Sequence, residues 1–168
     1  MRKFVCYALI GLGIILILVS GSTYLYQSGT IQPAVVPLPE QLVGLPQSTK
    51  ITGTQATQEF DMLHNQHFPL ISGAVGIYGD QRATLWIGGA PFNFMATDMI
   101  TAMHDKISDG GSPFTPKGEF KDGKRTIYVL EGMGQNHYYF QSKNLVIWLA
   151  VEPSIADEAL KQTLEAYP

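Results

Sequence analysis

The chain has 168 residues, a formal net charge of −3 and a charged fraction of only 15%. Its single cysteine excludes an intramolecular disulfide, and no basic cluster exceeds the pair Lys124-Arg125, so a nucleic-acid partner is not expected. Because this charge is sparse for a freely solvated surface, we expect part of the surface to lie against a partner or a membrane.

The N-terminus combines a short basic flank with a long uncharged segment. An apolar run from Phe4 to Val19 follows Arg2 and Lys3 directly. A helix over this run is about 24 Å long, and its continuation to Tyr26 reaches about 34 Å, enough to cross a hydrocarbon core of ~30 Å. Because a basic flank stays on the cytoplasmic side, we expect a cytoplasmic stub at 1–3 and a signal-anchor helix at 4–26. The cell membrane would then be crossed once, with the rest of the chain extracytoplasmic.

A cleaved signal peptide is the alternative for this segment. Small or tolerated residues, Val19 with Gly21 or Ser20 with Ser22, occupy the −3 and −1 positions of two possible cleavage sites. Cleavage would export the chain without an anchor. The mass of the mature protein distinguishes these two alternatives.

Residues 27–46 have the composition of a Pro-rich tether. Pro33, Pro37, Pro39 and Pro46 disfavour a helix and favour an extended, semi-rigid path. The segment also contains apolar residues that are unlike those of a solvated spacer: Val35, Val36, Leu38, Leu42, Val43 and Leu45. We therefore expect part of the tether to lie on the folded domain, which we assign to residues 47–168, or on a partner.

The first half of the domain predicts two helices and a hairpin. Thr54 is positioned to cap a helix over Gln55–Asn65. Strands at Ala74–Tyr78 and Ala83–Gly88 follow. In the second strand the aliphatic residues Ala83, Leu85 and Ile87 alternate with Thr84 and Trp86. A second helix is predicted over Asn93–Ser108, because an apolar stripe at helical spacing ends at two glycines.

The second half predicts a four-stranded meander and a closing helix. The expected strands are Glu119–Lys121, Lys124–Leu130, Asn136–Gln141 and Leu145–Val151. The closing helix is expected to start with a capping box formed by Ser154 and Asp157. The order α-ββ-α-ββββ-α predicts an α+β fold, with an antiparallel β-sheet of about five or six strands, helices packed on it, and one N-terminal transmembrane helix before it.

Aromatic residues on the central strands are the first candidate site. We select Trp86, His137, Tyr139 and Trp148 as residues that bind a ligand or partner. Period-2 alternation sends His137 and Tyr139 to one face of their strand, and the residues between and after them to the other. Since one face must be core, only one face is free to bind, and ordinary packing of sheet against helix is the alternative.

Histidine and methionine residues form a second candidate, a metal site. His64 and His67 are three residues apart at the end of the first predicted helix. Met99, Met103 and His104 lie in the second helix, and thioether ligands suit Cu(I). The alternatives are surface or capping histidines and a core stripe of methionines. Copper and zinc are the metals this hypothesis names.

No catalytic residue or cofactor is predicted. The chain has no Gly-x-Ser-x-Gly nucleophile elbow, and its carboxylates form no recognisable pair. An exported carboxylate-based hydrolase remains a hypothesis that requires two acids about 5–10 Å apart.

The leading hypothesis is a membrane-anchored extracytoplasmic domain that acts by binding a protein partner. An accessory subunit or partner-binding module of the cell envelope fits this description. A cytoplasmic part of three residues is too small to contain an output domain. The alternative function is an exported small-ligand, copper or zinc binding protein.

Overall fold

The computed structural model describes residues 2–168, so Met1 of the predicted cytoplasmic stub lies outside the described residues. The α+β fold and the large antiparallel sheet are confirmed, with nine strands in place of the five or six expected. The strands are β1 (Ala34–Val35), β2 (Gln41–Leu42), β3 (Leu45–Thr52), β4 (Ser72–Tyr78), β5 (Ala83–Gly89), β6 (Thr115–Asp122), β7 (Arg125–Gly132), β8 (Gln135–Ser142) and β9 (Leu145–Val151). The helices are α1 (Arg2–Ile31), α2 (Thr54–His64), α3 (Asn93–Ser108) and α4 (Ala156–Ala166).

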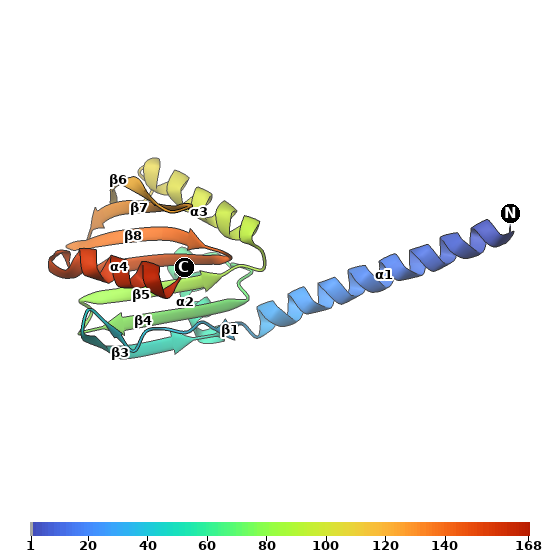
Figure 1. The fold of residues 1–168 in the computed structure, drawn as a ribbon, viewed down its shortest axis with the longest axis horizontal. Helices are drawn as coiled ribbons and strands as arrows, with labels where there is room; N and C mark the ends of the chain where they lie inside the picture. The colour runs from blue at the N-terminus through green and yellow to red at the C-terminus, as the bar shows by residue number, and fades with distance from the viewer. Residues whose placement is uncertain (1) are drawn as a thin grey trace.

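Helix α1 projects from the domain as a single straight element (Figure 1). Its 30 residues correspond to about 45 Å. The segment Leu9–Thr30 has a mean hydropathy of 2.0, so it is long and apolar enough to cross a membrane, and a signal sequence has the same properties. The helix continues five residues beyond Tyr26, where the sequence predicted its end.

The sheet has the order β2-β3-β4-β5-β9-β8-β7-β6, and all neighbours along this path are antiparallel. Strand β1 pairs in parallel with the start of β4. Strand β9 is central, as its apolar residues on both faces predicted. Strand β6 lies at one end of the sheet and pairs only with β7 among the described strands.

Helices cover both faces of this sheet. Helix α4 lies on one face, and its Ala159 and Leu160 pack with Leu85 and Phe140. Helices α2 and α3 lie on the other face, where α3 packs against β8 and β9 (Figure 1). The two faces of the central strands are therefore both core.

The Pro-rich segment after α1 belongs to the fold. Val36, Leu38 and Leu42 are buried in the same core cluster as α4. Two tyrosine hydroxyls also hold the segment, because Tyr78 donates to the carbonyl of Pro39 and Tyr167 donates to the carbonyl of Pro37. The expectation that part of this segment lies on the domain is confirmed.

Two local predictions at helix ends are wrong. Thr54 is the first residue of α2, and the N-cap position belongs to Gly53, which has a φ of 61°. A Cβ at Gly53 would stand 3.0 Å from the carbonyl oxygen of Pro33, so the chain needs glycine at this junction. At α4, a 3-10 turn over Pro153–Ile155 replaces the predicted capping box, and the hydroxyl of Ser154 donates to Glu152 instead.

Candidate functional site

The predicted aromatic residues meet as a ladder across neighbouring strands. Trp86 of β5 stands opposite Trp148 of β9, and Trp148 stands opposite Tyr139 of β8. The ladder continues to Tyr128 of β7, which is opposite Tyr139. Ring centroids are 5.4 Å apart for Tyr139 and Trp148, and 4.7 Å apart for Tyr128 and Tyr139, with nearly parallel planes. These pairs have the offset-stacked spacing that favours aromatic contact.

His137 joins the ladder through a hydrogen bond to tryptophan. The indole Nε1–H of Trp148 donates to Nδ1 of His137 over 3.1 Å, and Nε2 of His137 lies 3.0 Å from the carbonyl oxygen of Gly132. Since an indole nitrogen only donates, Nδ1 must accept and Nε2 must carry the proton. Burial lowers the pKa of His137, against the opposing effect of the Gly132 carbonyl. His137 is therefore a neutral, fixed group.

Most of the ladder lies beneath α3. Tyr139 is 1% exposed, His137 is also buried, and Trp148 is partly buried in the cluster that includes Ile100 of α3. Trp86 instead packs beside Phe60 of α2. The structure thus brings the four predicted residues onto one face, but helices cover that face. At the β7 end of the ladder, Tyr128 and Tyr139 line a cleft.

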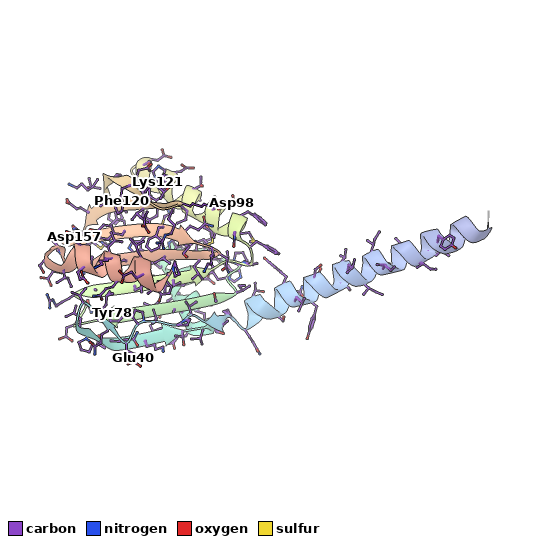
Figure 2. All side chains as sticks on the ribbon, in the orientation of Figure 1. Glu40, Tyr78, Asp98, Phe120, Lys121 and Asp157 are labelled. Atoms are coloured by element: carbon purple, nitrogen blue, oxygen red, sulfur yellow. The ribbon has the colours of Figure 1, made fainter. Side chains whose placement is uncertain are left out.

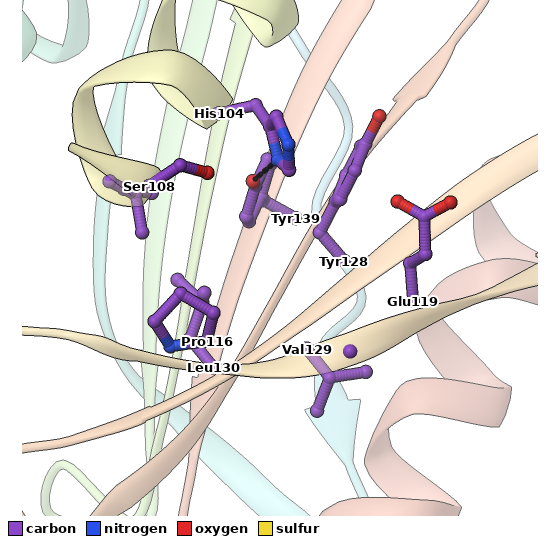
Figure 3. A pocket seen from close by; sticks show the side chains of 10 residues that line it. His104, Ser108, Pro116, Glu119, Tyr128, Val129, Leu130 and Tyr139 are labelled. Carbon is purple, nitrogen blue, oxygen red and sulfur yellow. Dashed lines mark hydrogen bonds between the residues drawn. The ribbon is translucent and has the colours of Figure 1, made fainter.

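At that end a cleft of about 110 Å³ separates α3 from β6 and β7. Figure 3 shows His104 of α3 pointing at the hydroxyl of Tyr139, with 3.1 Å between Nδ1 and the phenol oxygen. The ring of His104 lies 4.8 Å from that of Tyr128. Glu119 of β6 stands at the side of Tyr128 away from His104 (Figure 3). The remaining lining residues are Ile107, Ser108, Pro116, Gly118, Val129 and Leu130.

The cleft offers apolar walls and a few polar atoms. Burial raises the pKa of Tyr139, and the charges of Tyr128 and Glu119 add to the effect. Burial and then Glu119 also raise the pKa of Tyr128. Both phenols therefore remain protonated donors near neutral pH. Glu119 is the single carboxylate among the ten residues that line the cleft, whereas the hydrolase hypothesis requires a pair.

A second hollow lies on the opposite face of β6. This groove has a volume of about 480 Å³ and separates the β6–β7 hairpin from α4. Figure 2 places Phe120 and Asp157, two of its lining residues, on β6 and at the start of α4. Its other lining residues are Asp122, Arg125, Leu160, Lys161, Leu164 and Glu165. Apolar side chains and charges of both signs therefore line the groove.

Strand β6 runs between the cleft and the groove. Seven of its eight residues are exposed, including Phe120 at 43%. Pairing with β7 shifts register between Pro116 and Gly118, which is a β-bulge. Lys117 forms an ion pair with Glu131, and Lys121 donates to the hydroxyl of Thr126. Neither helix layer reaches far enough to cover this strand.

The predicted metal-ligating residues do not converge. Nδ1 of His64 lies 2.9 Å from the carbonyl oxygen of Phe60, and Nδ1 of His67 lies 2.7 Å from the Asp61 carboxylate. His104 contacts the ladder from α3, a different helix. The two methionines, Met99 and Met103, pack in the core beneath α3. Among the described residues no group of three or more His, Cys, Asp or Glu side chains is placed to hold a metal ion.

Sequence reasoning missed four residues of the two hollows: Tyr128, Glu119, Phe120 and Arg125. Tyr128 had a usable signal, because tight turns at Asp122-Gly123 and Gly132-Met133-Gly134 fix the register of β7 and place Tyr128 opposite Tyr139. Glu119, Phe120 and Arg125 had no signal in the sequence, because the hollows exist only where α3 and α4 stop short of the sheet edge.

Comparison with protein-family models, with curated proteins and with solved structures finds no match to this chain. Three geometric features of the molecule bear on its function. These are the apolar helix α1, the unpaired edge of β6, and the hollow on each side of that edge.

Proposed function

We propose that this chain is a single-pass membrane protein whose extracytoplasmic domain binds an extended segment of a protein partner along β6. The role that fits is an accessory subunit or partner-binding module of the cell envelope. Helix α1 supports the anchor, because its segment Leu9–Thr30 is long and apolar and is not buried in the domain. The basic residues Arg2 and Lys3 before it support a cytoplasmic N-terminus.

The observation that carries the proposal is the position of β6 between two hollows. An added strand gains main-chain hydrogen bonds from a free sheet edge, and its alternate side chains point to opposite faces. The cleft lies on one face of β6 and the groove lies on the other. Successive side chains of a bound segment would therefore enter the cleft and the groove in turn.

The sizes of the hollows define the chemistry of the segment. Ligand pockets for small molecules usually measure about 300–1,000 Å³. The cleft, at about 110 Å³, has room for one apolar or aromatic side chain beside Tyr128 and Tyr139. The groove adds an apolar floor at Leu160 and Leu164 with charges at its rim. The volume of the groove, about 480 Å³, falls within the small-molecule range, but a ligand that fills both hollows must cross β6. A polypeptide segment does this more readily than a compact ligand.

The same strand has features that prevent indiscriminate pairing. Lysines, proline and bulges on an edge strand discourage association between sheets. Strand β6 has Lys117, Lys121, Pro116 and a bulge at Gly118. These features leave a short accessible stretch from Glu119 to Asp122, so we expect the partner segment to pair over a few residues only.

Photo-crosslinking in native membranes tests the proposal. A photoreactive amino acid at Phe120 of the full chain should give a discrete adduct with a second polypeptide. The control is the same amino acid at Lys50, which is exposed on β3 near the opposite edge of the sheet. We expect no adduct from Lys50. Equal adducts from both positions would show nonspecific contact.

A proline substitution tests whether the partner uses the backbone of β6. Asp122 and Arg125 flank the two-residue turn, so the alternation of antiparallel pairing directs the N–H of Lys121 away from β7. Lys121→Pro removes this donor while an edge strand tolerates the ring. We expect Lys121→Pro to abolish the adduct and Lys121→Ala to preserve it. An adduct that survives Lys121→Pro would refute strand addition.

The membrane anchor is tested separately. The full-length chain should stay with the membrane fraction after alkaline carbonate extraction and keep its N-terminal residues by mass spectrometry. Protease added from outside should cleave the domain. A mature protein that lacks about 21 or 22 residues would establish the cleaved signal peptide instead.

A further inference from the structure

The junction between β5 and α3 exposes two phenylalanines, Phe92 just before α3 and Phe94 in its first turn, on the side of the domain from which α1 leaves. Residues 90–94 are called the phenylalanine loop below. We propose that Phe92 and Phe94 insert into the interface of the bilayer that α1 spans, and so fix the orientation of the domain on the membrane. This inference rests on the anchor in the proposed function and is independent of the β6 site.

The two rings form one apolar surface. Phe92 is 56% exposed and Phe94 is 63% exposed. Their ring centroids are 5.5 Å apart and their planes differ by 8°. Single exposed apolar residues are common, but two stacked aromatic rings at the start of a helix are an exposed patch of the kind that marks contact with a partner or a membrane.

A short series of backbone hydrogen bonds connects this loop to the end of α1. The N–H of Ala34, three residues after α1, donates to the carbonyl of Ile71 over 2.7 Å. The N–H of Ile71 donates to the carbonyl of Gly89 over 2.9 Å, and Phe92 follows three residues later. Two strand spacings, about 10 Å, therefore separate Ala34 from Gly89, and these residues lie three positions from the end of α1 and from Phe92, respectively. In Figure 1, α3 begins on the side of the domain that faces α1.

The length of α1 sets the height of the loop above the membrane. Thirty helical residues correspond to about 45 Å, and a bilayer with its headgroups is about 40–45 Å thick. A helix that begins at Arg2 on one side therefore ends at the headgroups of the other. Only Gln32 and Pro33 separate α1 from β1, so the domain has little room to rise away from the surface.

The neighbouring turn supplies a charge suited to the same surface. Asn144 exchanges two hydrogen bonds with Ala90, one through its carbonyl and one through its side-chain amide. This contact places the turn at Lys143, an exposed residue, beside the phenylalanine loop. The ammonium group of Lys143 would lie among the phosphate headgroups, while the two aromatic rings enter the acyl-chain boundary beneath them.

Site-directed fluorescence on the full chain in liposomes tests this inference. In a Cys6→Ala background, an environment-sensitive probe is attached at Asn93→Cys, between the two phenylalanines. We expect a blue-shifted emission and quenching by lipids that have a nitroxide near the headgroup. The same probe at Met133→Cys, in an exposed turn at the opposite end of β8, should show neither effect.

Two further variants separate the inference from the anchor. A probe at Ile15→Cys, in the middle of α1, should be quenched by nitroxides deep in the acyl chains. Phe92→Ser with Phe94→Ser should remove the quenching at position 93 and leave that at position 15. If position 15 is quenched and position 93 is not, the loop does not insert, although the anchor stands. If position 15 is not quenched, the anchor and the inference both fail.

Discussion

Individual buried polar side chains join the parts of this domain that are distant in sequence. Tyr167, near the C-terminus, donates to the carbonyl of Pro37, which is 130 residues earlier in the chain. Burial raises the pKa of Tyr78, which donates to Pro39, to about 12. Both hydroxyls therefore remain protonated donors through neutral pH. Among the described residues, no buried side-chain polar atom lacks a hydrogen-bond partner.

The Tyr167 hydroxyl gives a residue-level prediction. Tyr167→Phe leaves the carbonyl of Pro37 without its donor, and we expect the free energy of unfolding to fall by about 1–2 kcal/mol. Urea unfolding of the detergent-solubilised chain, followed by near-ultraviolet circular dichroism, measures the change. Tyr128→Phe, at a partly exposed tyrosine, is the matched control and should change stability by less than about 0.5 kcal/mol. Equal effects of the two substitutions would contradict the proposed role of Tyr167.

His137 predicts a loss of stability at acid pH. Burial lowers its pKa in the folded state below the ordinary value of about 6.5 that applies to the unfolded chain. Neither state is protonated above that value, but below it the unfolded chain binds a proton that the folded chain does not. The free energy of unfolding should therefore fall as the pH decreases through about 6.5.

His137→Phe tests this pH dependence. The variant loses two hydrogen bonds, so it should be less stable by about 2 kcal/mol near neutral pH. Its stability should also depend less on pH around the same value, since one titrating group is gone. Urea unfolding at several pH values provides the measurement. An unchanged pH dependence in the variant would show that His137 is not the group responsible.

At the scale of elements, strong local patterns gave accurate boundaries. Helix α3 and strand β9 have the bounds that the sequence predicted, Asn93–Ser108 and Leu145–Val151. Helix α3 has an apolar stripe at helical spacing, and β9 is a continuous apolar run. Both have clear end signals. Strand β6 is longer than predicted, because Thr115–Gly118 has no alternation and becomes a strand only by pairing with β7. The short strands β1 and β2 likewise depend on tertiary pairing.

The segment between α1 and β3 predicts a contrast between two apolar residues. Leu42 is fully buried against the core, whereas Val35 is exposed. We expect Leu42→Ala to lower the free energy of unfolding by about 3 kcal/mol, and Val35→Ala to change it by less than about 0.5 kcal/mol. Urea unfolding of both variants checks this. If both substitutions change the free energy of unfolding only slightly, the segment does not contribute to the core.

At the scale of the whole molecule, the domain begins before the boundary that the sequence indicated at residue 47. Val36, Leu38 and Leu42 are buried in a core cluster with residues of β4, β5 and α4. The hydrophobic core therefore includes part of the segment between α1 and β3. This arrangement also explains how a domain without a disulfide builds a sufficient core.

Fragments test where the domain begins. A fragment of residues 32–168 retains the buried segment and should unfold cooperatively on heating. A fragment of residues 47–168 exposes the core surface that this segment covers, so it should melt at a lower temperature or aggregate. Differential scanning calorimetry and size-exclusion chromatography distinguish the two outcomes. If both fragments melt alike, the segment contributes no core.

The candidate site shows a limit of pattern reasoning at this scale. Alternation along β8 correctly separated His137 and Tyr139 from Tyr138 and Phe140, because side chains in a strand point to alternate faces. The alternation did not indicate which face was open to solvent, and helices cover both faces of the central strands. The accessible surface lies instead at β6, a strand that the sequence marked only weakly.

Local residue patterns predicted the apolar N-terminal helix, the α+β class, the turns, and the strands and helices with strong periodicity. These features depend on residues close together in the chain. Packing of the folded chain settles that the Pro-rich segment joins the core of its own domain, that most of the aromatic ladder lies under α3, and that hollows flank β6. Each of these depends on how far one element extends over another, and that distance is set by packing between residues tens of positions apart.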